Sequence, residues 1–118
     1  MIVRRKRIYE PSAPEDGTRV LVDRLWPRGL SKASAAVDVW LKEIAPSHEL
    51  RRWYAHEPSR WEAFRTRYFA ELDATPEPVA ALRELIARGP VTLVFSSREV
   101  DLNNARALVE YLEREPGP

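Results

Sequence analysis

The sequence predicts an α/β fold with a small, mostly parallel sheet of about four strands and helices on both faces. Segments 20–22 and Val91–Phe95 are short apolar runs rich in β-branched residues, as in strands buried on both faces. Between these runs, apolar residues recur three and four positions apart, as on the buried side of a helix. Because the chain has 118 residues, we expect one domain over 1–118, with a short disordered tail from about residue 115.

Composition restricts the class of protein. The chain is 44% apolar and 31% charged, which is typical of globular proteins. It contains no apolar run of the roughly 18–20 residues that a membrane span needs and no secretory signal, so we expect a cytoplasmic protein with no membrane partner. The absence of cysteine excludes disulfides, thiolate nucleophiles and cysteine-based metal sites. A net charge of +1 provides no overall field that attracts nucleic acid.

The first ten residues predict a strand that is interrupted by the basic run 4–7. Its apolar anchors are Ile2, Val3, Ile8 and Tyr9. The basic run either protects an edge strand against pairing with another sheet or binds phosphate. We favour the first interpretation because charge runs are usually solvated. Segment 11–18, with two prolines and an Asp-Gly pair, predicts a loop.

A rigid loop follows the predicted strand Arg19–Asp23. Pro27 fixes its own φ and restricts Trp26 to extended geometry, and Gly29 permits a positive φ. In open α/β sheets, ligands bind at the carboxyl ends of the strands. The side chains that this loop presents there are Asp23, Arg24, Trp26 and Arg28.

The segment after this loop is short and mixed in pattern. Ser31 is a candidate N-cap for a helical turn within 31–37. Segment 37–45 alternates apolar and polar residues as a strand does, but its apolar residues also fit one helical face. We expect a short extended segment there, because Pro46 closes the run so early.

Three helices are predicted next. Ser47 is the N-cap of a helix over about 48–56, and Pro58 lies in the first turn of the second helix. The third helix has Thr75 as its N-cap and ends at Gly89. The expected buried face of the second helix is Trp61, Phe64, Tyr68 and Leu72.

The last strand and helix complete the predicted fold. Val91–Phe95 is the clearest strand and is expected to be central, and Asp101 is expected to cap the helix after it. If segments 20–22 and Val91–Phe95 lie parallel and adjacent, loops 26–28 and 96–98 meet at the same edge of the sheet.

The side chains at this edge point to a phosphate-bearing ligand, either a nucleotide or single-stranded nucleic acid. Arg24 and Arg28 can bind a phosphate bidentately, or they pair with structural carboxylates. Trp26 either stacks a base or packs in the core. Hydroxyl, guanidinium and amide groups at the amino end of a helix also suit an anion, unless they only satisfy backbone groups. The residues with these groups are Ser96, Ser97, Arg98 and Asn103.

Two other functions stay open. Asp23 is a candidate general base for a small hydrolase or transferase acting on an anionic substrate, or else it has a structural hydrogen-bonding role. An interaction domain with tryptophan-rich helices is the third possibility. His48 and His56 are eight residues apart, unlike a helical metal pair, and no metal or cofactor motif is present. We therefore expect no cofactor and no metal, and the oligomeric state stays open.

Several motifs, in the order KRIYEP, RVLVDRLWPRGLSK, WLKEIAPSHELR, RWEAFRTRYFAEL, VTLVFSSRE and NNA, carry a family resemblance. From about Lys6 to Leu112 the chain resembles the YeaO-like family of uncharacterised bacterial proteins (domain of unknown function 488). The resemblance implies a small cytoplasmic α/β domain and implies no reaction, cofactor or catalytic residues. Ser97 and Arg98 stand where this family often has a small residue and a lysine. The charge is kept, but a guanidinium stays protonated. The motif positions are Lys6, Arg24, Trp26, Pro27, Arg28, Gly29, Lys42, Pro46, Ser47, Leu50, Arg51, Ser96 and Asn103.

Overall fold

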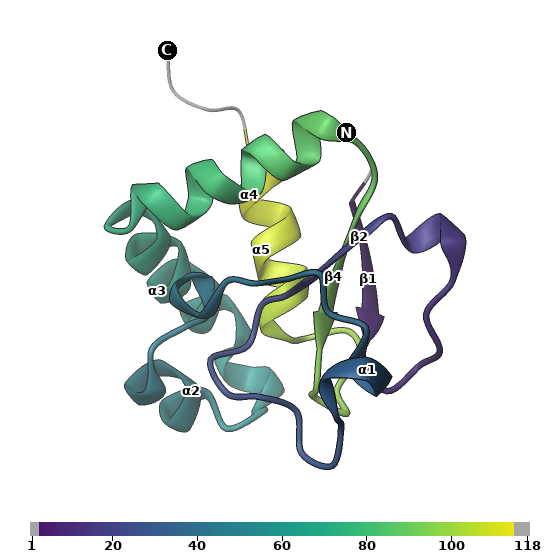
Figure 1. Cartoon of the computed structure of the whole chain (residues 1–118). Coiled ribbons are helices and arrows are strands. Elements are labelled where there is room, and N and C mark those ends of the chain that lie inside the picture. Colours follow the sequence, from purple (N-terminus) through teal and green to yellow (C-terminus); the bar gives the residue numbers. More distant parts are fainter. Residues whose placement is uncertain (1–2, 115–118) are drawn as a thin grey trace.

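A computed structural model of the chain describes residues 3–114 (Figure 1). Its four strands, all parallel, form one sheet in the order β1-β4-β2-β3, which confirms the predicted small α/β fold. The strands are β1 (Val3–Arg7), β2 (Thr18–Leu21), β3 (Val39–Trp40) and β4 (Val91–Phe95). The helices are α1 (Lys32–Ala35), α2 (His48–Tyr54), α3 (Trp61–Asp73), α4 (Pro76–Arg88) and α5 (Asn104–Glu113). Short 3-10 turns cover Pro14–Asp16, Lys42–Ile44 and Pro58–Arg60.

Strand β4 is central, as predicted, and all five of its residues are buried. It pairs with β1 on one side and with β2 on the other, where Val20 lies opposite Leu93 and Leu21 opposite Val94. Because side chains alternate along a strand, odd- and even-numbered residues of β4 face different layers. Strand β1 lies at the edge of the sheet, as the protective interpretation of its basic run requires.

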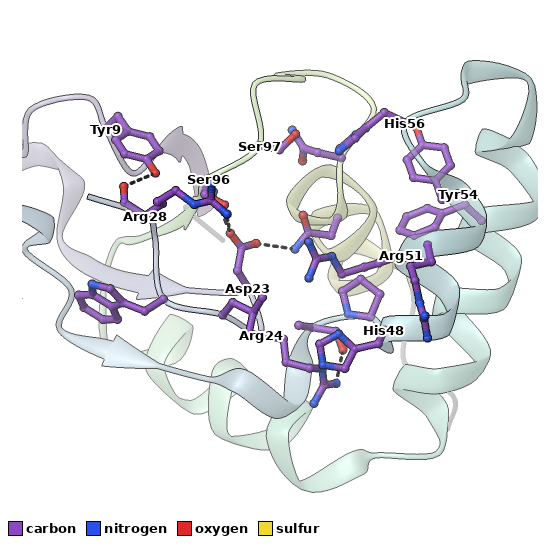
Figure 2. A pocket seen from close by; sticks show the side chains of 18 residues that line it. Tyr9, Asp23, Arg24, Arg28, His48, Arg51, Tyr54, His56, Ser96 and Ser97 are labelled. Atoms are coloured by element: carbon purple, nitrogen blue, oxygen red, sulfur yellow. Dashed lines mark hydrogen bonds between the residues drawn. The ribbon is translucent and has the colours of Figure 1, made fainter. Parts of the chain in front are cut away.

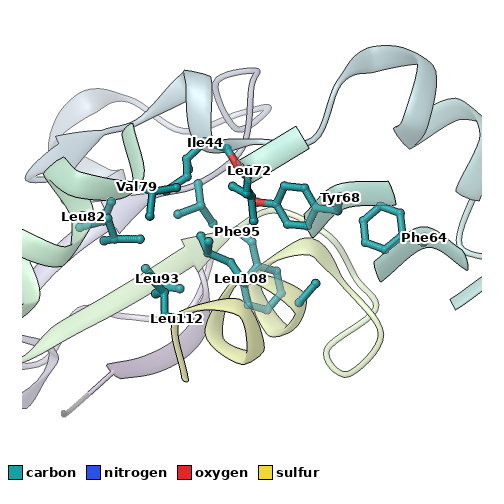
Figure 3. Close-up of a cluster of buried hydrophobic side chains, with 14 of the residues drawn as sticks. Ile44, Phe64, Tyr68, Leu72, Val79, Leu82, Leu93, Phe95, Leu108 and Leu112 are labelled. Atoms are coloured by element: carbon teal, nitrogen blue, oxygen red, sulfur yellow. Dashed lines mark hydrogen bonds between the residues drawn. The ribbon is translucent and has the colours of Figure 1, made fainter. Parts of the chain in front are cut away.

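The larger core lies between one face of the sheet and helices α2 to α5 (Figure 3). The four predicted apolar residues of α3 are all buried, and the most exposed of them, Trp61, is only 7% exposed. The buried Tyr68 hydroxyl donates a hydrogen bond of 2.6 Å to the carbonyl of Ile44. Burial raises the pKa of this phenol, so it stays protonated as the donor. The bond therefore ties α3 to the turn before α2.

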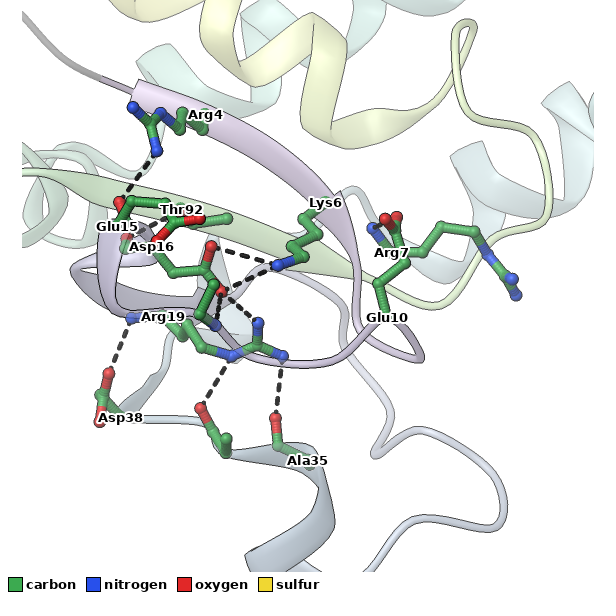
Figure 4. Close-up of polar contacts among 12 residues, drawn as sticks. Arg4, Lys6, Arg7, Glu10, Glu15, Asp16, Arg19, Ala35, Asp38 and Thr92 are labelled. Atoms are coloured by element: carbon green, nitrogen blue, oxygen red, sulfur yellow. Dashed lines mark hydrogen bonds and ion pairs between the residues drawn. The ribbon is translucent and has the colours of Figure 1, made fainter.

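The opposite face of the sheet is covered by α1 and by loops, and it contains a buried ion pair (Figure 4). Asp16 Oδ2 lies 2.8 Å from Arg19 Nη1 and 3.2 Å from Lys6 Nζ. Asp16 and Arg19 are only 4% and 3% exposed. The other Arg19 nitrogens donate to the carbonyls of Ala35 and Ala36. This charge group therefore fixes α1 and the turn before β2 against the sheet.

One of the predicted helix caps lacks its side-chain hydrogen bond, and another is wrong. Thr75 is the N-cap residue of α4, as predicted, but its hydroxyl donates back to the carbonyl of Glu71 and does not accept from the first turn of α4. Asn103, and not Asp101, caps α5 by accepting a 2.9 Å hydrogen bond from the amide of Arg106. An N-cap must directly precede the first helical turn, and Asp101 lies too early, in the bends at 100–103.

The other elements follow the predictions more closely. Ser31 and Ser47 cap their helices, and each accepts a hydrogen bond of 3.1 Å. Segment 37–45 is extended only at Val39–Trp40 and then forms a 3-10 turn before Pro46. The predicted tail from about residue 115 lies outside the described residues. None of the helices in 3–114 is long and apolar enough to cross a membrane.

Candidate functional site

A cavity of about 890 Å³ opens at the carboxyl ends of β2 and β4, within the usual size range of ligand sites. These strands are neighbours and run parallel, so the loops after them meet at one edge of the sheet, as predicted. The lining residues are Tyr9, Asp23, Arg24, Leu25, Trp26, Arg28, Ala45, Pro46, His48, Arg51, Arg52, Tyr54, His56, Phe64, Ser96, Ser97, Asn103 and Asn104.

Asp23 joins the two loops (Figure 2). One carboxylate oxygen accepts hydrogen bonds from the amide and the hydroxyl of Ser96, at 2.8 and 2.9 Å. The other oxygen accepts from the side-chain amide of Asn104, at 3.2 Å. Both oxygens are thus engaged by donors of the second loop and of α5. This geometry supports the structural interpretation of Asp23 over that of a general base.

The two predicted arginines of the first loop differ in their surroundings. Arg24 is half-buried and donates through Nη2 to the carbonyl of Ala45, at 3.0 Å. Arg28 is exposed, and its backbone carbonyl accepts a 2.9 Å hydrogen bond from the hydroxyl of Tyr9. Among residues 3–114, neither guanidinium has a carboxylate partner within ion-pair distance. The predicted pairing of these arginines with structural carboxylates is therefore absent from the described part of the chain.

Trp26 lines the cavity, but its indole is committed to the core of the second face. Its ring packs edge-on against Trp40, with centroids 5.4 Å apart, and its indole N–H donates to the carbonyl of Leu30 at 2.7 Å. These contacts favour core packing of Trp26 over stacking on a base.

The residues predicted after β4 are only partly brought to the cavity. Ser97 lines it, and its backbone carbonyl is held by the guanidinium of Arg7 at 2.8 Å. Asn103 also lines it, but both ends of its side-chain amide are engaged in capping α5 and in bonding to Glu99. Arg98 is exposed and does not line the cavity.

Helix α2 forms the opposite wall, which reasoning from the sequence did not place at the site. Figure 2 shows Arg51, Tyr54 and His56 across the cavity from Asp23 and Arg28. The lining residues of α2 are spaced three and four apart, as on one side of a helix: His48, Arg51, Arg52 and Tyr54. The HELRR spacing was readable from the sequence. Its position opposite the sheet edge depends on packing between distant elements.

Two sets of contacts hold this wall. The amide and hydroxyl of Ser47 donate to the carboxylate of Glu71 at 2.9 and 2.6 Å, which fixes the start of α2 against α3. The Tyr54 hydroxyl donates to the carbonyl of Leu102 at 2.7 Å. Burial, with the nearby Glu99 carboxylate, raises the pKa of this phenol, so it remains a donor. The end of α2 is thereby tied to the loop before α5.

The chain turns sharply after α2. Ala55 and His56 both have positive φ, at 46° and 55°, a left-handed conformation that non-glycine residues rarely adopt. Strained backbone of this kind concentrates at functional sites. These two residues bring the exposed His56 ring to the cavity.

The electrostatic character of the cavity is strongly positive. Four arginines line it, and Asp23 is its one carboxylate among residues 3–114. Clefts lined by one sign of charge concentrate ligands of the opposite charge. No group of three or more histidine, aspartate or glutamate side chains that could hold a metal occurs within the described residues. The arrangement is suited to binding an anion.

Comparison with known proteins gives consistent matches over most of the chain. A family model described as "Inactive DUF488-N3 subclade" matches residues 2–116. An uncharacterized protein of Mycobacterium tuberculosis is 46% identical over 110 residues, which cover 93% of this chain and 92% of that protein. The uncharacterized protein YeaO of Escherichia coli is 40% identical over 112 residues, which cover 95% of this chain and 97% of YeaO. No solved structure matches at the same level of significance.

Proposed function

The chain belongs to the YeaO-like DUF488 family, and from this premise we propose that it is a binding module for a phosphate-bearing ligand, a nucleotide or single-stranded nucleic acid. The ligand lies in the cavity at the carboxyl edge of the sheet. The observation that carries this proposal is the excess of four arginines over one carboxylate around a single cavity. Guanidinium groups bind phosphate oxygens through paired hydrogen bonds.

The hydrogen bonds of Asp23 leave the positive charge of the cavity arginines available to a ligand. Since both of its oxygens already accept hydrogen bonds from Ser96 and Asn104, it is poorly placed to pair with an arginine. The side chains of Arg28, Arg51 and Arg52 are exposed at the cavity, so they can contact a ligand without any rearrangement of the core. The amino end of α5 lies at the same edge and adds a favourable dipole.

A binding role is favoured over catalysis. The Ser96 hydroxyl donates to Asp23, a weak base, and the matched family is described as inactive. An activated serine requires a general base, usually a histidine, held by a third group. No histidine is hydrogen-bonded to either residue in the described part of the chain.

A thermal-shift panel tests the proposal. Phosphate, nucleotides and short single-stranded oligonucleotides are added to the wild type and to Arg28→Ala. Arg88→Ala serves as the matched control, because Arg88 is an exposed arginine on α4 that, among residues 3–114, pairs only with its helical neighbour Glu84. A ligand at about a hundred times its dissociation constant stabilises the protein by roughly 2.7 kcal/mol, which is about 10 °C for a chain of this length.

We expect a shift with at least one of these ligands in the wild type and in Arg88→Ala. In Arg28→Ala the affinity should fall about tenfold to a hundredfold, as for the loss of a hydrogen bond to a charged group. No shift with any phosphate-bearing ligand would contradict the proposal. An equal shift in Arg28→Ala would remove Arg28 from the site.

A further inference from the structure

The guanidinium groups around the cavity come from two walls. Arg24 and Arg28 belong to the loop after β2, and Arg51 and Arg52 belong to α2 (Figure 2). Each wall is fixed separately, the first through Asp23 and Ser96 and the second through the cap of α2. One phosphate group is small compared with a cavity of about 890 Å³, so charges on both walls are better matched by several anionic groups.

The tryptophan, phenylalanine and Tyr54 rings of the cavity are poorly available for stacking, and the exposed rings there are those of Tyr9, His48 and His56. Trp26 packs against Trp40, and Tyr54, 4% exposed, stacks on Phe64 with centroids 4.4 Å apart. Tyr9 is 41% exposed, but the guanidinium of Arg7 lies 5.0 Å from its ring centre. Proteins that bind single-stranded nucleic acid rely on exposed rings that stack successive bases. No tryptophan or phenylalanine in the described cavity provides such a platform.

We propose that the ligand is a compact anion with two or more phosphate groups, which bridges the loop after β2 and helix α2, and that no base is stacked. This inference rests on the proposed phosphate-binding function and narrows its ligand class. A pyrophosphate or triphosphate group supplies enough charge to engage Arg28 and Arg51 together. A nucleoside attached to it extends out of the cavity and adds little affinity.

Isothermal titration separates the phosphate groups from the base. The probes are inorganic phosphate, tripolyphosphate, adenosine triphosphate, adenosine and a short single-stranded oligonucleotide. We expect tripolyphosphate to bind at least tenfold more tightly than phosphate, and adenosine triphosphate to bind within about threefold of tripolyphosphate. Adenosine should give no heat of binding.

Variants of opposite walls test the bridging. Arg28→Ala and Arg51→Ala should each weaken tripolyphosphate about tenfold or more, because each removes a charged contact. Inorganic phosphate reaches one wall only, so just one of these variants should weaken it. Arg88→Ala should leave both affinities unchanged, and circular dichroism should show that all three variants retain the fold.

Four results would overturn the inference. Adenosine triphosphate binding more than tenfold tighter than tripolyphosphate would show recognition of the base. Equal losses for phosphate and tripolyphosphate in both variants would indicate a single anion subsite. Binding of an oligonucleotide but not of tripolyphosphate would assign the site to nucleic acid and leave the proposed function standing. Absence of binding by every phosphate-bearing probe would end both proposals.

Discussion

Replacing Asp23 by alanine should destabilise the protein and open the cavity, because this carboxylate joins the two loops of the site. The substitution removes hydrogen bonds of 2.8 and 2.9 Å from Ser96 and one of 3.2 Å from Asn104. The Asn104 amide keeps a partner, since it also donates to the carbonyl of Val22 at 3.0 Å. The main loss is therefore the charge-assisted bond to the Ser96 amide, which is half-buried.

A hydrogen bond to a charged group contributes about 1.5–3 kcal/mol, and an unsatisfied buried donor adds a similar penalty. We expect Asp23→Ala to lower the free energy of unfolding by about 2–4 kcal/mol. For a chain of this length, about 1 kcal/mol corresponds to about 4 °C, so the melting temperature should fall by roughly 8–16 °C. Ser96→Ala removes only the hydrogen bond from the Ser96 hydroxyl to Asp23 and should lower the free energy of unfolding by about 1 kcal/mol.

Urea and thermal unfolding, both followed by circular dichroism, measure these differences. Asp38→Ala is the matched control, because the Asp38 carboxylate accepts a 2.8 Å hydrogen bond from the Arg19 amide near the amino ends of the strands. It should lower stability without changing the response to tripolyphosphate, whereas Asp23→Ala should lower both. A melting temperature of Asp23→Ala within about 3 °C of the wild type would refute this reasoning. If the wild type converts a ligand that an Asp23→Asn variant only binds, this result would instead support the hydrolase or transferase hypothesis, with Asp23 as general base.

Three further predictions concern the framework of the site. Asp16→Asn should lower the free energy of unfolding at pH 7 by about 3–5 kcal/mol, because Arg19 keeps its charge while buried. Burial acts to raise the pKa of Asp16, but hydrogen bonds from the Ala13 amide, Arg19 and Lys6 outweigh it, so the pKa lies below its ordinary value of about 3.9. The Asp16 contribution is therefore complete above that ordinary value and is lost as the pH falls through the folded-state pKa. Urea unfolding should show a smaller stability difference between the wild type and Asp16→Asn at pH 3 than at pH 7, and an equal difference at the two pH values would contradict this reasoning. Gly17→Ala should lower the free energy of unfolding by about 1–3 kcal/mol, because φ at Gly17 is +64° and the added Cβ would meet the carbonyl of Pro90. An unchanged urea midpoint would contradict this prediction. Ser47→Ala should lower the free energy of unfolding by about 1–2 kcal/mol and weaken tripolyphosphate binding, since α2 loses its cap and its hydrogen bond to α3. Unchanged binding in a titration would show that α2 is not part of the ligand site.

Local sequence patterns predicted most elements of the fold, because each depends on residues close together in the chain. Val91–Phe95 is a continuous apolar run, and such a run is stable only between two covered faces. The spacing of Trp61, Phe64, Tyr68 and Leu72 predicted the buried side of α3 for a similar reason. The caps were less predictable: Thr75 and Asp101 have the right residue types but the wrong backbone partners.

The candidate site was predictable to the extent that it follows from strand geometry. A loop after β2 and a loop after β4 must share an edge once the two strands are parallel neighbours. That rule brought Arg24, Arg28 and Ser96 to one cavity. Arg98 comes from the same loop as Ser96 yet does not line the cavity, since the direction of a single side chain on a turn is not fixed by the strand before it.

The sequence by itself determined most of the strands and helices and the residues of the first wall, because short-range periodicity and turn residues specify them. The tertiary structure decided the order of the strands in the sheet and the second wall of the site. Arg51 and Arg52 read as an ordinary solvated helix face, and they reach the cavity because Ser47 bonds to Glu71 and Tyr54 to the loop before α5. The same holds for Trp26, whose neighbour Trp40 is distant in sequence. Contacts between distant segments depend on how whole elements pack, and no local pattern contains that information.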